Sequence, residues 1–257
     1  MYQVLVKMEG INIKSTANRF IINYTVRFVS ASLFVYSCWI PFQYLGGWFS
    51  YHVILCTFGV SRCNFINSPR YIPLMAEAIM LFVGDDIWSK NLSRRAKYTV
   101  HGILITVATL ITIVGNVLVF VYIEPGYHLY TAHGITGLVS MIILIISIIL
   151  GLAVHYPKST KRIVSLRPVT FKFLHNISGL MGYGIGIISL CFGYFTDWFK
   201  YFNGAESRWV ALIFTMAVSL WPLNGAFVSL WNQWKSLLER RAETSPTPSA
   251  ICSPEII

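Results

Sequence analysis

The sequence predicts an all-α membrane protein with six transmembrane helices, and three observations lead to this fold class. Of the 257 residues, 55% are hydrophobic and only 12% are charged, with a mean hydropathy of +0.61. Several apolar runs reach about 20 residues, the helix length that crosses a hydrocarbon core of about 30 Å. The basic residues gather in alternate loops, as they do in polytopic membrane proteins. This composition excludes an ordinary soluble domain.

Six spans are expected in the following order: 25–46, 52–83, 98–121, 130–154, 172–193 and 208–231. Together they form one transmembrane domain over residues 25–235. Residues 1–24 are mixed and polar without a clear period, and we assign them to an N-terminal tail. Residues 236–257 end in a Ser/Pro/Thr-rich stretch typical of a disordered C-terminal tail. No internal repeat is convincing.

The second span is interrupted. Residues 52–83 are too long for one crossing, and residues 60–70 contain two arginines, two asparagines and a proline. A charge at mid-bilayer costs roughly 2.5–3.5 kcal/mol. Without residues 60–70, the flanks join into a span of ordinary length with His52 at its head. We therefore interpret 60–70 as an insertion, which arises either from a sequence-prediction or splicing artefact or from a genuine isoform.

The loop charges predict the topology. Sixteen of the twenty basic residues, with Arg27 counted among them, fall in the N-terminal tail, the second and fourth loops and the C-terminal tail. The opposite side carries only Lys200 and Arg208. The positive-inside rule places the sixteen, and both termini, in the cytoplasm. The net charge of +10 is therefore a topology signal, and no nucleic-acid partner is expected.

Four histidines, His52, His101, His133 and His175, each stand near the N-terminal end of one of four successive spans. Because consecutive spans run in opposite directions, His52 and His133 share one side, and His101 and His175 share the other. Two neutral imidazoles facing each other across a helix bundle provide the axial ligands of a b-type haem. The pattern thus predicts that helices 2–5 form a four-helix bundle around two haems b, with these histidines as iron ligands. Ligation by two histidines leaves no open coordination position, which favours electron transfer.

The other polar residues of the spans carry weaker expectations. His155 ends the fourth span and is expected at the interface, whereas His128 is either exposed or contacts an electron acceptor. Glu77 is the only acid within a span, and either bonds a helix neighbour or supports a haem ligand or propionate. The five cysteines show no CxxC spacing, so neither disulfides nor zinc nor iron–sulfur clusters are expected. No catalytic side chain is expected, since electron transfer needs no nucleophile or general base.

Six short motifs in these spans match a known family. They are FSYH and LMAEAIMLF at the two ends of the second span, LSRRAKYTVHG at the third, TAHGITG and LAVHYP at the fourth, and FLHNISGLMGYGIG at the fifth. Over about residues 25–235 the chain resembles the cytochrome b561 family, in particular its short members that are called cytochrome b561 domain-containing proteins. It departs from the family at residues 60–70, and Val53 stands where members often have proline.

The resemblance implies a six-helix fold with two b haems, whose ligands map onto His52, His101, His133 and His175. It also implies a transmembrane reductase that takes electrons from cytoplasmic ascorbate and gives them to monodehydroascorbate radical or ferric iron on the opposite side. Ascorbate is an anion, and Arg95 and Lys97 lie within two turns of His101, so we expect them to attract it. Topology alone also explains these two charges.

The expected environment is a lipid membrane, with the endoplasmic reticulum or another endomembrane or vesicle favoured over the plasma membrane. A homodimer is left open. Two other functions are left open as well. One is a haem-binding subunit of another redox complex, such as an NADPH-oxidase-like or respiratory enzyme. The other is a non-redox polytopic transporter that uses its histidines for proton coupling. The visible spectrum separates them, because a transporter without haem is colourless.

Overall fold

The computed structural model describes residues 2–60, 74–82, 89, 91–164 and 167–243. Within these ranges all regular secondary structure is helical. The helices are α1 (Tyr2–Gln43), α2 (Trp48–Val60), α3 (Leu74–Met80), α4 (Arg94–Tyr122), α5 (Ala132–His155), α6 (Pro157–Ile163), α7 (Pro168–Gly193), α8 (Asp197–Phe202) and α9 (Ala205–Glu243). The predicted all-α class is confirmed.

Within the described ranges, five helices are long and apolar enough to cross a membrane. These candidate spans are Ile21–Gln43, Arg94–Tyr122, Ala132–His155, Pro168–Gly193 and Ala205–Glu239. They correspond to five of the six predicted spans, and the chain is a multi-pass membrane protein. The remaining predicted span is present as α2, with 13 residues, and α3, with 7, each too short to cross alone. Apart from Val60, which ends α2, the predicted insertion 60–70 lies outside the described residues.

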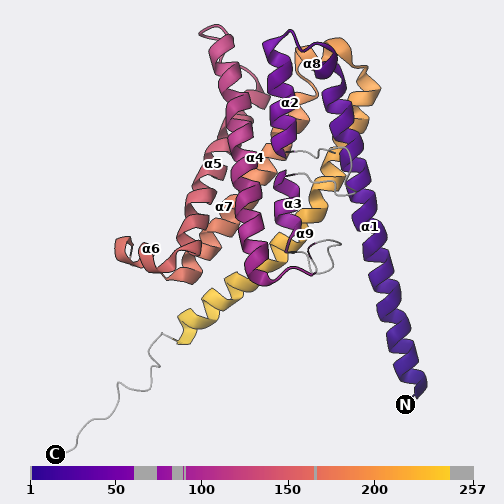
Figure 1. Ribbon diagram of the computed structural model, residues 1–257, viewed down its shortest axis with the longest axis vertical. Helices are drawn as coiled ribbons and strands as arrows, with labels where there is room; N and C mark the ends of the chain where they lie inside the picture. Colours follow the sequence, from indigo (N-terminus) through magenta and orange to yellow (C-terminus); the bar gives the residue numbers. More distant parts are fainter. Residues whose placement is uncertain (1, 61–73, 83–88, 90, 165–166, 244–257) are drawn as a thin grey trace, which may run out of the picture.

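The helices that carry the four histidines lie side by side. Helices α5 and α7 pack along their lengths, and α2 and α3 both pack against α4. Figure 1 shows α3 below α2 along the same side of α4, in the place of one longer helix. Helices α1 and α9 flank this group, with α1 against α2 and α9 against α3 and α7. Helix α8 lies at one end of the assembly and α6 at the other (Figure 1).

Local sequence signals start the histidine-bearing helices α4 and α5. The Ser93 hydroxyl accepts a hydrogen bond from the Ala96 amide at 3.2 Å, and the Thr131 hydroxyl accepts one from the Gly134 amide at 3.1 Å. Such caps satisfy amides that have no partner within the helix. Helix α7 begins instead with Pro168 at its first turn, where the missing amide costs nothing. Each helix therefore starts within two turns of its histidine.

Helix α1 is longer than the expected span. It runs from Tyr2 through the residues assigned to a tail, and no proline interrupts its hydrogen-bond ladder before Pro41. Arg27, which the loop-charge count assigns to the cytoplasmic side, is not a loop residue. It lies within α1 and is buried. That part of the charge count is wrong, because the guanidinium lies inside the protein, where it forms an ion pair with Glu77.

Two clusters hold the helices together. One is centred on Met75, Ala108, Leu144 and Tyr183, and joins α3, α4, α5 and α7 in the middle of the assembly. The other joins α7, α8 and α9 around Tyr194, whose hydroxyl lies 3.0 Å from the Thr215 hydroxyl. Large apolar side chains on the outer faces are exposed, as expected of surfaces that contact lipid.

Candidate functional site

The four predicted histidines meet in two pairs. The ring centroids of His52 on α2 and His133 on α5 are 6.0 Å apart, with 76° between the ring planes. The rings of His101 on α4 and His175 on α7 are also 6.0 Å apart, with 88° between the planes. The structure thus brings together the residues that the alternating helix directions pair. Their role as iron ligands stays a prediction.

Every ring in the two pairs has the same hydrogen bond. The Nδ1 atoms of the histidines bond backbone carbonyl oxygens: His52 to Gly115 at 2.9 Å, His101 to Ala78, His133 to Ser189 and His175 to Ser147, each at 2.8 Å. A carbonyl oxygen can only accept, so each Nδ1 must carry the proton. The lone pair of each neutral ring is then on Nε2. This is the arrangement that orients a histidine that binds a metal.

Helices α5 and α7 exchange these bonds reciprocally. The Ser189 hydroxyl donates to the His133 carbonyl at 2.8 Å, and the Ser147 hydroxyl donates to the His175 carbonyl at 3.3 Å. His133 and Ser147 of α5 therefore correspond to His175 and Ser189 of α7, and both correspondences have the same separation along the chain. The two antiparallel helices are clamped by the same contacts at both ends, and each clamp includes one histidine.

Two glycines follow the same symmetry and give the rings room. A Cβ at Gly151 would lie 3.0 Å from Cε1 of His175, and a Cβ at Gly193 would lie 3.3 Å from Cε1 of His133. Both distances are shorter than ordinary van der Waals contact between carbon atoms. The imidazoles therefore lie directly against the backbone of the neighbouring helix, and a Cβ at either glycine would require the ring to shift by a few tenths of an ångström.

The interrupted span contributes to both pairs. Helix α2 provides His52, whereas α3 provides the Ala78 carbonyl that holds His101. In return, α4 provides His101 and the Gly115 carbonyl that holds His52. The same interval, about four helical turns, separates the histidine from the acceptor residue on α4, α5 and α7. At a rise of about 1.5 Å per residue, the two pairs lie at levels about 21 Å apart, within the thickness of a hydrocarbon core.

The spacing within each pair fits a haem iron. A bond between an imidazole nitrogen and a first-row metal is about 2 Å, and the nitrogen lies about 1 Å from the ring centroid. One metal between two Nε2 atoms therefore requires centroids about 6 Å apart, as observed. Over the described ranges, no group of three or more His, Cys, Asp or Glu side chains could hold a metal ion without such a cofactor.

The two expected ascorbate contacts differ in position. Lys97 is half-buried and lies four residues before His101, so it shares a helix face with that histidine. Arg95 is exposed and lies six residues before His101, on another face. Both stay predictions, and the register favours Lys97.

The remaining histidines take no part in the pairs. His155 is exposed at the end of α5 and packs against Tyr156. His128 stacks on Phe120, and its Nε2 bonds the Phe120 carbonyl at 3.1 Å. Each of these contacts is local, and the roles expected for the two residues stay predictions.

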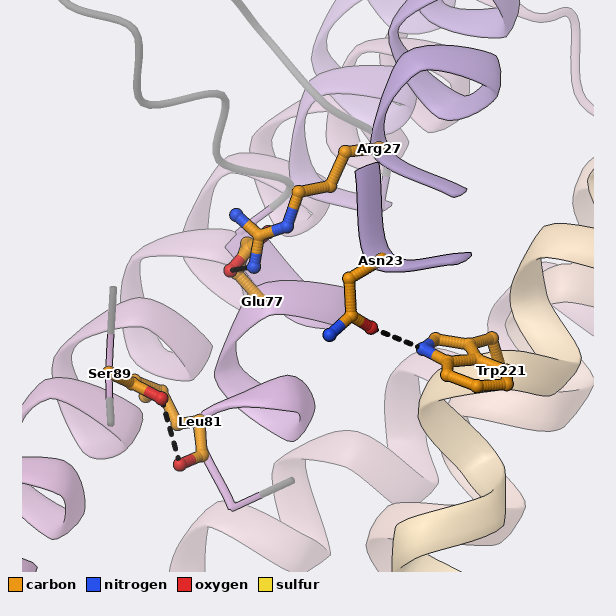
Figure 2. Close-up of polar contacts among 6 residues, drawn as sticks. All are labelled: Asn23, Arg27, Glu77, Leu81, Ser89 and Trp221. Atoms are coloured by element: carbon orange, nitrogen blue, oxygen red, sulfur yellow. Dashed lines mark hydrogen bonds and ion pairs between the residues drawn. The ribbon is translucent and has the colours of Figure 1, made fainter. Parts of the chain in front are cut away.

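Two polar contacts near the histidine pairs involve partners that were not predicted from the sequence. Glu77 is ion-paired with Arg27 of α1 at 2.9 Å, and Figure 2 shows the two side chains pointing toward each other. The Cys56 thiol lies 3.5 Å from both the His52 Nδ1 and the Asn116 Oδ1. A lone acid and a lone arginine, each within an apolar span, are a sequence signal for the first contact. No comparable signal marks the second.

The comparisons with known proteins agree with this geometry. The family profile described as eukaryotic cytochrome b561 matches residues 65–200, which include His101, His133 and His175 but not His52. The mouse protein named transmembrane reductase CYB561D2 is 29% identical over 178 residues, which are 68% of this chain and 74% of the relative. Its human counterpart is 28% identical over the same shares, and the bovine one is 30% identical over 59% of this chain and 63% of the relative. No solved structure matches the chain.

The profile covers more than half of the chain and includes both residues of the His101–His175 pair. Membership of the family implies haem b as the cofactor, and the paired imidazoles fit it. The chain therefore belongs to the cytochrome b561 family.

Proposed function

We propose that this protein is a transmembrane reductase with two haems b. It takes electrons from ascorbate on the cytoplasmic side and delivers them to monodehydroascorbate radical or ferric iron on the opposite side. The observation that supports this most is the presence of two equivalent imidazole pairs at opposite ends of one helix bundle. The printed name of the mouse, human and bovine relatives, transmembrane reductase, agrees with it.

In this proposal α2 and α3 form one broken crossing, so that six crossings enclose or flank the bundle. The four Nδ1–H···O=C bonds hold the rings with their Nε2 lone pairs available before any cofactor binds. A haem b held between two imidazoles supplies one-electron chemistry at an iron with no open coordination position. The chain positions the two sites about 21 Å apart along the helices.

The donor side of the proposal rests on charge. Arg95 and Lys97 lie in the first turn of α4, near the His101–His175 pair. A small anion such as ascorbate is attracted to such cations, and Lys97 lies one turn from His101 on the same face. The positive-inside rule places this end of the bundle in the cytoplasm, where both termini would also lie.

The reduced-minus-oxidised spectrum of the purified protein tests the proposal. We expect the bands of haem b ligated by two histidines, reducible by ascorbate, at about two haems per chain. His101→Ala removes one ligand of the proposed donor-side site, so we expect about one haem per chain and at least a tenfold loss of ascorbate reduction rate. The matched control is His155→Ala, because His155 is exposed and outside both pairs.

Each unfavourable result has a clear meaning. A colourless protein contradicts the proposal and favours a transporter that uses its histidines for protons. A protein that contains haem but is not reduced by ascorbate contradicts only the donor. In that case a subunit of another redox complex becomes the better interpretation.

A further inference from the structure

A buried ion pair lies next to one of the two proposed haem sites. Glu77 precedes Ala78, whose carbonyl accepts the hydrogen bond from the Nδ1 of His101. Nη2 of Arg27 donates to Oε2 of Glu77 at 2.9 Å. Arg27 comes from α1 and Glu77 from α3 (Figure 2). The contact therefore joins a helix outside the histidine bundle to the short helix whose Ala78 carbonyl accepts the hydrogen bond of His101.

The pair is costly for a membrane protein. The side chains of Arg27 and Glu77 are 9% and 0% exposed. Taking two charges out of water costs several kcal/mol per ion, and apolar replacements of such pairs are often at least as stable. Charged residues inside a membrane domain therefore point to a function, with the partner as part of it. Stability alone is a weak reason for this pair to exist.

Two further contacts anchor the segments that carry the pair. One turn before Arg27, the side-chain oxygen of Asn23 accepts a hydrogen bond of 2.8 Å from the Trp221 indole of α9. At the other end of α3, the Ser89 hydroxyl donates to the Leu81 carbonyl at 3.3 Å. Helix α3 is short, so such contacts from outside determine where its carbonyl groups lie.

We propose that the Arg27–Glu77 ion pair is a positioning and charge-balancing pair that sets the midpoint potential of the haem at His101–His175. Glu77 neutralises a guanidinium that cannot lose its proton. The pair also holds α3 so that the Ala78 carbonyl polarises the His101 imidazole. This inference rests on the proposed function, since it concerns a haem bound by these two histidines.

The sign of the effect follows from both parts of the proposal. Glu77→Gln removes a negative charge near the site, so the local charge becomes more positive, which favours the reduced and less positive iron. A weaker bond from Nδ1 of His101 to Ala78 makes the imidazole a poorer donor, which also favours the reduced iron. At an effective dielectric constant of about 20, a unit charge about 10 Å away changes an equilibrium constant roughly tenfold.

Potentiometric titration of the haem absorbance measures this effect one site at a time. In a His133→Ala background only the His101–His175 haem remains. There we expect Glu77→Gln to raise the ratio of reduced to oxidised haem about tenfold at a fixed potential, which is a rise of about 59 mV for one electron. In a His101→Ala background, which leaves the other haem, we expect no change.

Two further variants separate tuning from a general structural defect. The double variant Arg27→Gln with Glu77→Gln removes one charge of each sign and loses only the hold on α3, so its potential should stay above that of the wild type but shift much less than in the single variant. Lys200→Gln breaks the exposed pair between Lys200 and Asp197 and should change neither haem. The proposal is overturned if Glu77→Gln leaves the potential unchanged, if both haems shift together, or if the double variant shifts as far as the single one.

The proposal can still be tested if the Glu77→Gln variant does not fold. If Glu77→Gln binds no haem, a double variant that binds both haems and raises the potential of the His101–His175 haem alone supports the proposal, whereas wild-type potentials at both haems overturn it. Loss of haem in both variants overturns it and leaves the pair a structural role. If the wild-type protein itself binds no haem, the proposed function fails and the inference fails with it.

Discussion

The four histidines proposed as ligands share one feature, a hydrogen bond from Nδ1 to a backbone carbonyl of a neighbouring helix. Four helices and four different acceptor residues produce the same contact at 2.8–2.9 Å. An imidazole that merely filled the core would have no reason to leave Nε2 without a hydrogen bond to any described residue in all four cases. This uniformity is the strongest residue-level argument for metal ligands over proton carriers.

The glycines that touch the rings lead to a prediction. Gly151→Val adds a side chain where a Cβ alone would lie 3.0 Å from Cε1 of His175, so the ring must leave its position. We expect haem content to fall from about two per chain to about one, measured by the pyridine haemochrome assay. The control is Gly184→Val on α7, because a Cβ there meets nothing within 4 Å. Two haems in Gly151→Val would show that the ring position is not critical.

The sequence predicted the histidine pairs but not the groups that hold them. Alternating helix direction is enough to pair His52 with His133 and His101 with His175. The acceptors are backbone carbonyls of Gly115, Ala78 and two serines, and a backbone carbonyl has no signature in the sequence. The ion pair of Glu77 joins residues 50 positions apart, and only the packing of α1 against the bundle brings them together.

At the level of the helices, one spacing repeats. On α4, α5 and α7 the same interval of about four turns separates the histidine from the acceptor carbonyl. On the broken crossing His52 and Ala78 are farther apart along the chain, and the surplus equals the length of segment 61–72. That segment is slightly longer than the predicted insertion 60–70. No repeat is convincing in the sequence because the repeated elements are contacts, which require only a histidine, a small residue and this interval.

This register predicts the outcome of two deletions. Deletion of 61–72 should place Ala78 on the same face relative to His52 as in the three regular helices. We expect two haems per chain and a Tm at least equal to that of the parent, because fewer residues then connect α2 and α3. The shorter deletion 61–71 turns α3 by about 100° and should lower haem content to about one. Equal haem content in both deletions would refute the register argument.

For the whole molecule, the important quantity is the separation of the two sites. A single site cannot connect the two faces of a membrane, because the levels of the pairs differ by about 21 Å. In the proposed function, the second haem would therefore be the intermediate step. The site of this second haem includes His52, which lies outside the residues matched by the family profile. A measurement of electron transfer across the membrane therefore tests the part of the bundle that has the least support from sequence similarity.

Proteoliposomes with ferricyanide trapped inside and ascorbate outside measure this transfer directly. His133→Ala removes a ligand from the site farther from the proposed donor, while His101 and His175 keep their contacts with Ala78 and Ser147. We expect ascorbate still to reduce one haem per chain, but reduction of the trapped ferricyanide should fall at least tenfold, since electrons then face a gap of about 21 Å. His155→Ala should transfer electrons as the wild type does. A full transmembrane rate in His133→Ala would mean that electrons do not pass through the His52–His133 site, and that one haem with another route connects the two faces.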